Sequence, residues 1–200
     1  MSNTTQSDAA GDTSDHVCCP PFDPSTYYDD NGNEHKLITW KNKPFAKDGT
    51  RCFYYIPLRF GQAVIRLLDR ISTAGAGASD KDVMILSDCV SPWYSNIFMS
   101  VAKEEVEGAA VEKISGVFVA KAFQGDYSKM GGWAKEMEEL VSQVKRTVAM
   151  DDGEGKMDLE VKSKSREHNE PKMYFHYPTC PKCSKKYKAN HVVIFARLSE

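Results

Sequence analysis

The sequence predicts an α+β fold, in which two consecutive strand–helix–strand–strand units form one mostly antiparallel sheet with two helices on one face. Two stretches, 61–72 and 130–145, carry apolar residues at three- and four-residue spacing, as amphipathic helices do. Short runs rich in aromatic and β-branched residues precede and follow each of them. Because one such unit cannot bury both faces of its strands, we expect the two units to share a continuous sheet.

The composition describes a soluble globular chain and argues against two classes of partner. The 200 residues carry a formal net charge of −2 and a hydrophobic fraction of 41%, which is ordinary for a single domain. This balance favours neither nucleic acid nor a membrane as partner, and no apolar run approaches the roughly 20 residues that span a bilayer. Residues 1–16 have the composition of a disordered tail and lack the features of a secretory signal. We therefore expect a cytoplasmic protein whose partner is a small molecule; its oligomeric state stays open.

The remaining residues, 17–200, are predicted to form one domain that begins with an extended arm over 17–45. The motif Cys18-Cys-Pro-Pro-Phe-Asp-Pro24 cannot be helical, because each proline restricts the residue before it. We expect the arm to lie on the domain, with Trp40 as its anchor.

The first half-unit is predicted over about 52–104. Its opening strand is assigned to 52–58, which is rich in aromatic and β-branched residues. The helix over 61–72 follows and ends at an alternating Ala-Gly run. Two apolar runs, 83–86 and 97–103, supply the paired strands that complete the unit.

The second half-unit, about 114–199, repeats this order. It consists of a strand, a helix, a solvated charged loop and two closing strands, at 114–123, 130–145, 150–170, 173–177 and 191–198. The closing strands flank a loop that carries two cysteines.

The spacing Cys180-Pro-Lys-Cys183 predicts a metal site. A gap of two residues lets both thiolates reach one tetrahedral ion, and Cys18 and Cys19 supply two further ligands if the arm returns to this loop. The predicted metal is a structural zinc ion; a disulfide or redox pair, or ordinary thiols, stay open as alternatives. A thioredoxin-like site is excluded, because too few residues follow Cys183 for the long helix that such a motif opens.

Three polar residues are the candidate catalytic groups. Asp88 follows an apolar strand, where burial can raise a carboxyl pKa and suit it to acid or base catalysis; the alternative is an aspartate that caps a turn. Alternation along the strand places Tyr174 and His176 on one face. A histidine beside a tyrosine on a concave sheet suits proton transfer, and the alternative is an exposed polar face.

A second set of residues is predicted to line a ligand cleft. These residues are aromatic or polar and lie near strand ends or in the turn before the second helix: Tyr55, Trp93, Lys121, Gln124, Tyr127 and Trp133. The alternative for both tryptophans is a place in the core. No serine-hydrolase elbow, P-loop or dinucleotide fingerprint occurs in the sequence.

The element order and one motif resemble the GyrI-like (gyrase-inhibitor-like) superfamily of small-molecule-binding proteins. The stretch Phe118-Val-Ala-Lys-Ala-Phe-Gln-Gly-Asp-Tyr-Ser-Lys-Met-Gly-Gly-Trp133 is similar to its central strand–turn–helix signature. The chain also resembles a group of bacterial proteins labelled hydrolases, through Cys18-Cys-Pro-Pro-Phe-Asp-Pro24 and Thr179-Cys-Pro-Lys-Cys-Ser-Lys-Lys-Tyr187. Gln124 departs from that group, which often has a glutamate there, so a carboxylate that could polarise water is an amide in this chain.

The resemblance implies a protein that binds an apolar or aromatic small molecule between its half-units. Hydrolysis of that compound is one reading, with water activated by Asp88 or His176 because no strong protein nucleophile is evident. Two alternatives stay open: a non-catalytic module that sequesters its ligand, and an interaction module that zinc staples together.

Overall fold

The computed structural model describes residues 19–54, 56–79, 82–151 and 171–199. Several predictions lie outside the described residues, namely those for the tail over 1–16, for nearly all of the charged loop over 150–170, for Cys18 and for Tyr55.

The described residues form seven strands, three α-helices and two short 3-10 helices. In chain order they are η1 (Pro24–Tyr27), β1 (Lys36–Phe53), β2 (Ile56–Pro57), α1 (Phe60–Thr73), β3 (Ile85–Ser91), β4 (Tyr94–Ser100), β5 (Ala110–Gln124), η2 (Tyr127–Lys129), α2 (Met130–Asp151), β6 (Met173–His176), α3 (Pro181–Tyr187) and β7 (His191–Ser199).

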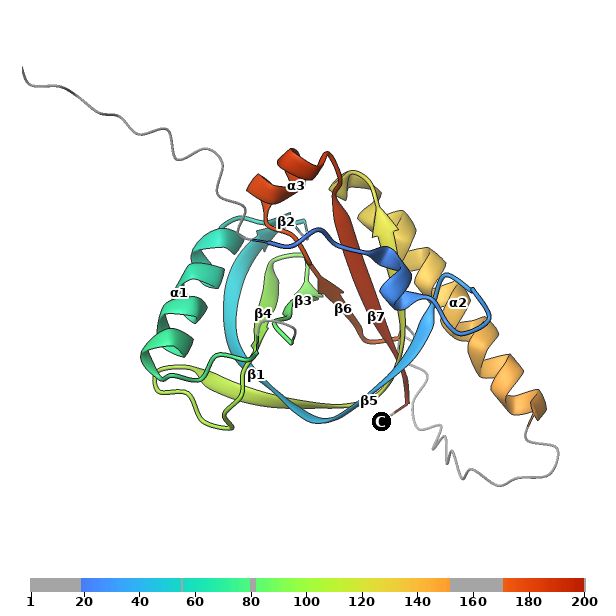
Figure 1. The fold of residues 1–200 in the computed structure, drawn as a ribbon, viewed down its shortest axis with the longest axis horizontal. Coiled ribbons are helices and arrows are strands. Elements are labelled where there is room, and N and C mark those ends of the chain that lie inside the picture. Colours follow the sequence, from blue (N-terminus) through green and yellow to red (C-terminus); the bar gives the residue numbers. More distant parts are fainter. Residues whose placement is uncertain (1–18, 55, 80–81, 152–170, 200) are drawn as a thin grey trace, which may run out of the picture.

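The sheet closes into a barrel. Its strands follow the order β1-β4-β3-β6-β7-β5, and β5 pairs again with β1. Every ladder is antiparallel, and β2 adds a short pairing to the end of β1. The predicted α+β class with its mostly antiparallel sheet is confirmed (Figure 1), whereas the duplication of two half-units stays a prediction. Closure of the sheet was not predicted.

The two longest strands, β1 and β5, make closure geometrically feasible. The first part of β1 pairs only with β5, residues 45–47 pair with both β5 and β4, and the register with β4 continues to Arg51. Between Trp40 and Lys43 the register shifts, and Asn42 adopts a positive φ of 47°. Such a bulge bends a strand and increases its twist, so β1 can curve around the barrel.

An aromatic cluster, here called the barrel core, fills much of the interior. Its members are Trp40, Phe45, Leu86, Phe98, Ile114, Phe118, Ala120, Tyr174, Val193 and Phe195. The ring of Trp40 lies at its centre, 4.5 Å from Phe118 and 4.9 Å from Phe195 between ring centroids. Offset and tilted rings at such distances favour tight packing.

Both long helices pack on the outer face of the barrel, which confirms the prediction that they share one face of the sheet (Figure 1). Helix α1 buries Ala63, Leu67 and Ile71 against β1 and β4. Helix α2 buries residues that include Trp133 and Met137 against β5 and β7. Within the described part of the chain, no helix is both long and apolar enough to cross a membrane.

Two element predictions are wrong. The opening strand is not at 52–58, because β1 runs from Lys36 to Phe53, through the stretch assigned to the arm. The side chains of Phe53 and Tyr54 are 57% and 65% exposed. Their aromatic character predicts a strand, but these side chains are not buried against the sheet. The region between the closing strands is not only a loop, since it contains the seven-residue helix α3.

The N-terminal arm crosses one mouth of the barrel, where Figure 1 shows it in blue. Phe22 packs on His191 and Tyr27 on Phe195, with ring centroids 5.0 and 5.9 Å apart. Both side chains pack against the barrel core. The arm therefore closes part of the barrel opening.

Candidate functional site

A hollow opens where β3 and β6 separate. The ladder between these strands has only two residue pairs, Leu86 with His176 and Ser87 with Phe175. Beyond them, the edges of both strands line a mostly apolar hollow of about 2580 Å³. The arm, α1 and α2 complete its walls. A small molecule would be sought first in such a mostly apolar hollow with a few polar side chains in its wall.

His176 lines this hollow as a neutral imidazole. Its Nδ1 lies 3.0 Å from the carbonyl oxygen of Ile85. Because a carbonyl oxygen only accepts, Nδ1 carries the proton and Nε2 keeps a lone pair. Burial and, to a smaller extent, the nearby charge of Lys43 lower the pKa of His176 from 6.5 to about 4, although the bond to Ile85 opposes the shift. The ring is therefore an acceptor at neutral pH.

Asp88 lines the same hollow from β3. It is 7% exposed, and its Oδ1 accepts the backbone N–H of Asn96 at 3.2 Å. Burial raises the pKa of Asp88, although the Asn96 bond and the charges of Lys172 and Lys47 oppose the shift. Asp88 lies within a strand and not in the turn that the capping alternative requires. A carboxylate with a raised pKa is a stronger base than an ordinary aspartate.

Asp88 and His176 lie diagonally across the β3–β6 ladder. Leu86 is the cross-strand partner of His176, and Asp88 is two residues further along the same face. Diagonal neighbours of this kind are roughly 7–8 Å apart. That separation leaves room for a water molecule or a substrate group between the two side chains.

Tyr174 shares the inner face of β6 with His176, as alternation predicts, but it lies in the barrel core. It is 1% exposed, and its ring contacts those of Phe98, Phe118 and Trp40. It does not line the hollow. Its proposed part in proton transfer stays a prediction.

The predicted ligand-lining residues are dispersed. Trp133 is 8% exposed and stacks on Phe123 beneath α2, with ring centroids 5.5 Å apart. It therefore lies in the core, as the alternative for this residue predicted. Lys121 forms an ion pair with Glu136 of α2 at 2.9 Å, on the outer side of the barrel. Gln124 is exposed at the end of β5. None of these three lines the hollow.

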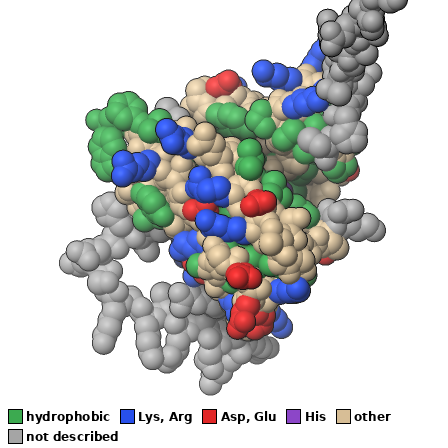
Figure 2. All heavy atoms as spheres, turned by 90° about the vertical axis from the view of Figure 1, so that its left-hand side faces the viewer, with side chains coloured by type: hydrophobic (Ala, Val, Ile, Leu, Met, Phe, Trp, Pro, Cys, Tyr) green, Lys and Arg blue, Asp and Glu red, His purple; other side chains and the backbone are tan. Residues whose placement is uncertain are grey.

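Tyr127 and Trp93 have different surroundings. Tyr127 lines the hollow and packs on Tyr177 with ring centroids 6.0 Å apart. Trp93 is 55% exposed and contacts the rings of Phe53 and Tyr54. Exposed hydrophobic side chains also gather on the face that carries α1 (Figure 2). Of the predicted ligand-lining residues that the structure describes, only Tyr127 is therefore part of the hollow's wall.

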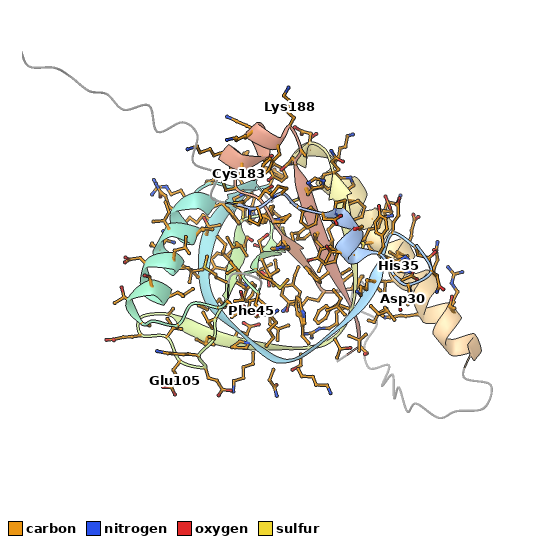
Figure 3. The ribbon with its side chains drawn as sticks, in the orientation of Figure 1. Asp30, His35, Phe45, Glu105, Cys183 and Lys188 are labelled. Carbon is orange, nitrogen blue, oxygen red and sulfur yellow. The ribbon has the colours of Figure 1, made fainter. Side chains whose placement is uncertain are left out.

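The structure brings three of the four predicted metal ligands together. The Sγ atoms of Cys19, Cys180 and Cys183 all lie within 4.8 Å of one another. The backbone N–H of Cys180 points to Cys19 Sγ at 3.4 Å, and that of Cys183 points to Cys180 Sγ at 3.5 Å. Figure 3 labels Cys183 at the start of α3, close to the arm. This three-cysteine group, here called the cysteine cluster, could hold a metal ion.

The arm is held at the cysteine cluster by a further contact. The hydroxyl of Tyr187, at the end of α3, donates to the carbonyl oxygen of Cys19 at 2.5 Å. Helix α3 has only two turns, so the exclusion of a thioredoxin-like site, which depends on a long helix, is consistent with the structure.

Sequence reasoning missed Lys43. Its Nζ lies over the rings of Trp40 and Phe45, at 5.7 and 6.0 Å from their centroids, and 3.3 Å from Met84 Sδ. Lys43 also lines the hollow. Burial lowers its pKa, while the charge of Asp82 opposes the shift. No spacing signal identifies this residue, because the bulge before it changes the alternation of β1.

Comparison with known families places the chain in one of them. The model of the bacterial hydrolase family matches residues 9–151 and 148–198. No curated protein matches the chain. The resemblance to the GyrI-like superfamily stays a prediction. Because the match covers most of the sequence, the chain belongs to the bacterial hydrolase family.

Proposed function

We propose that the protein hydrolyses an apolar or aromatic small molecule bound in the hollow, with water activated by Asp88 and oriented by His176. The observation that carries this proposal is that both residues face the same hollow from adjacent strands, each fixed by a hydrogen bond to a backbone group. The family to which the chain belongs supports the reaction class. The mostly apolar wall supports the class of substrate.

The two residues suit different parts of the reaction. Asp88 has a raised pKa, so it is a stronger base than an ordinary aspartate and takes the proton as the water oxygen attacks the electrophilic carbon. His176 stays neutral, and its Nε2 accepts the second hydrogen of the water. When the bond to the leaving group breaks, the proton on Asp88 passes to that group and the carboxylate is restored.

The test is hydrolysis of chromogenic esters, for example p-nitrophenyl acetate, butyrate and benzoate, followed by absorbance. We expect Asp88→Asn to lower kcat/KM by about 100-fold or more. His176→Gln should also lower kcat/KM, but by less. Asp69→Asn is the matched control, because Asp69 is an exposed carboxylate of α1 away from the hollow.

Full turnover by Asp88→Asn would contradict the mechanism. A wild-type protein that binds aromatic compounds in the hollow but turns over no substrate would instead favour the alternative, a module that sequesters its ligand without catalysis.

A structural zinc site is a second proposal, favoured by the cysteine cluster. The sulfurs of a tetrahedral zinc site lie about 3.8 Å apart, given Zn–S bonds of about 2.3 Å. The three Sγ atoms all lie within 4.8 Å of one another, which is near enough for them to share one ion. Cys18, next to Cys19 in the sequence, remains the predicted fourth ligand. Such a site would staple the arm to α3, since Cys19 belongs to the arm and the other two cysteines to the start of α3.

Native mass spectrometry of protein purified without chelator tests the zinc proposal. We expect a mass increment of one zinc ion that disappears in Cys180→Ser and in Cys183→Ser. Cys89→Ser is the control, because Cys89 lies on β3 outside the cluster. The bare polypeptide mass in the wild-type protein would count against zinc.

A further inference from the structure

We infer that Lys43 forms an anion-binding site in the hollow, so that the ligand is an apolar or aromatic compound with a carboxylate, sulfonate or comparable anionic group. This inference names the substrate class of the proposed function and rests on it for the reaction. The binding site itself is argued from the contacts of Lys43.

The bulge in β1 turns Lys43 toward the hollow. Before the bulge, alternate residues ending with Trp40 face the interior, and unbroken alternation would place Asn42 there next. The register shift makes Lys43 and Phe45 the inward residues instead, as Nζ over the rings of Trp40 and Phe45 shows. Bulges often re-aim side chains next to functional sites.

The bulge is held by specific contacts. Asn42 has a positive φ of 47°, which is uncommon for a residue with a side chain. Its backbone N–H donates to Ser115 Oγ at 2.8 Å, and that hydroxyl donates to Asn42 Oδ1 at 3.1 Å. These contacts stabilise the bulge in β1, and the bulge directs Lys43 toward the interior.

The ammonium group of Lys43 lacks the partner that comparable lysines have. Lys47 and Lys121 are also partly buried, and each has a carboxylate oxygen within 2.9 Å. Among the ion pairs of the described residues, none involves Lys43. Its hydrogen-bond partner is Met84 Sδ, a weak acceptor. A partly buried ammonium with three donors is stabilised by an anion or another strong acceptor.

The surroundings of Lys43 fit an aromatic anion. The rings of Trp40 and Phe45 stabilise the cation, and Lys43 lines the hollow. A ligand could pair its anionic group with Nζ while its apolar body contacts the wall. The acceptor Nε2 of neutral His176 and the carboxylate of Asp88 then lie toward the other polar parts of the ligand.

The test compares two fluorescent probes with the same aromatic body. These are 8-anilinonaphthalene-1-sulfonate, which is anionic, and N-phenyl-1-naphthylamine, which is neutral. We expect Lys43→Met to weaken the sulfonate about 10-fold or more, which is typical for loss of a charge-assisted hydrogen bond, and to leave affinity for the neutral probe within twofold. Lys43→Arg should retain the sulfonate. Lys135→Met, at an exposed position of α2, is the matched control.

Equal loss of both probes, or unchanged binding of the sulfonate, would overturn the inference. Lys43→Gln is the second variant if Lys43→Met does not fold. The result is independent of turnover, because neither probe is a substrate. Asp88→Asn should keep or strengthen sulfonate binding, since it removes a negative charge from the hollow. A failed anion site and a failed hydrolase are therefore distinguishable.

Discussion

Tyr174 and His176 lie two residues apart on the same face of β6, yet one belongs to the packed interior of the barrel and the other to the hollow. Rings from three other strands surround Tyr174. His176 lies where β3 and β6 pair for the last time before they separate. The comparison teaches that a face of a strand does not have one environment. Neighbouring strands decide, position by position, whether a side chain is packed or available to a ligand.

The sharpest test of this comparison is to remove the ring of Tyr174. Tyr174→Ala should lower the free energy of unfolding by about 3–5 kcal/mol, as loss of a fully buried aromatic side chain does. Tyr174→Phe keeps the ring and should cost less than about 1 kcal/mol. Denaturant unfolding measures both. Equal stability of the two variants would show that the ring is not packed as described.

The second test uses the pKa of His176. The folded protein holds this pKa near 4, below the ordinary 6.5. As the pH falls, His176 therefore takes up a proton in the unfolded chain before it does so in the folded protein. The stability that His176 contributes is fully present above pH 6.5 and is lost as the pH falls toward 4. The loss is on the order of 3 kcal/mol. Asp88 acts in the opposite direction, because its raised pKa favours the protonated form in the folded state.

The contribution of His176 is isolated by difference. Unfolding free energies of wild type and His176→Gln, measured between pH 7 and pH 4, should converge as the pH falls. A constant difference across that range would mean that His176 titrates normally and is not enclosed by the hollow's wall.

The smallest expected effect comes from an exposed aromatic residue. Trp93→Ala should change stability by no more than about 0.5 kcal/mol, because Trp93 is 55% exposed. Trp133→Ala is its counterpart and should cost about 3–5 kcal/mol, since Trp133 is buried against Phe123. Thermal or denaturant unfolding of both variants checks this. A large loss of stability in Trp93→Ala would contradict this description, because it would mean that the ring of Trp93 is buried against another surface.

Some of the candidate site was predictable from local pattern. Alternation placed Tyr174 and His176 on one face, and the position of Asp88 after an apolar run indicated a buried carboxylate. The two-residue gap between Cys180 and Cys183 indicated a shared site, and the structure brings Cys19, another predicted ligand, to it. These inferences hold because each depends on a period or spacing within one segment.

Other features were beyond the reach of local pattern. Lys43 was missed because the bulge at Asn42 changes which residues of β1 face inward. The hydrogen bond between Asn42 and Ser115 that holds this bulge joins residues 73 positions apart. The stretch 52–58 was misread because the aromatic side chains of Phe53 and Tyr54 are exposed. Trp133 and Lys121 were taken for ligand contacts because no sequence signal tells which way a side chain points relative to α2.

The sequence by itself determined the α+β class, the two long helices, the face of the sheet that they share and the spacing of the closing cysteines. These follow from periodicity and short-range chemistry, which act between residues a few positions apart. Only the tertiary structure decided that β5 pairs back to β1, that β3 and β6 separate around a hollow, and that Asp88, His176 and Lys43 line it. Such pairings join distant segments, and the packing of many side chains at once selects them.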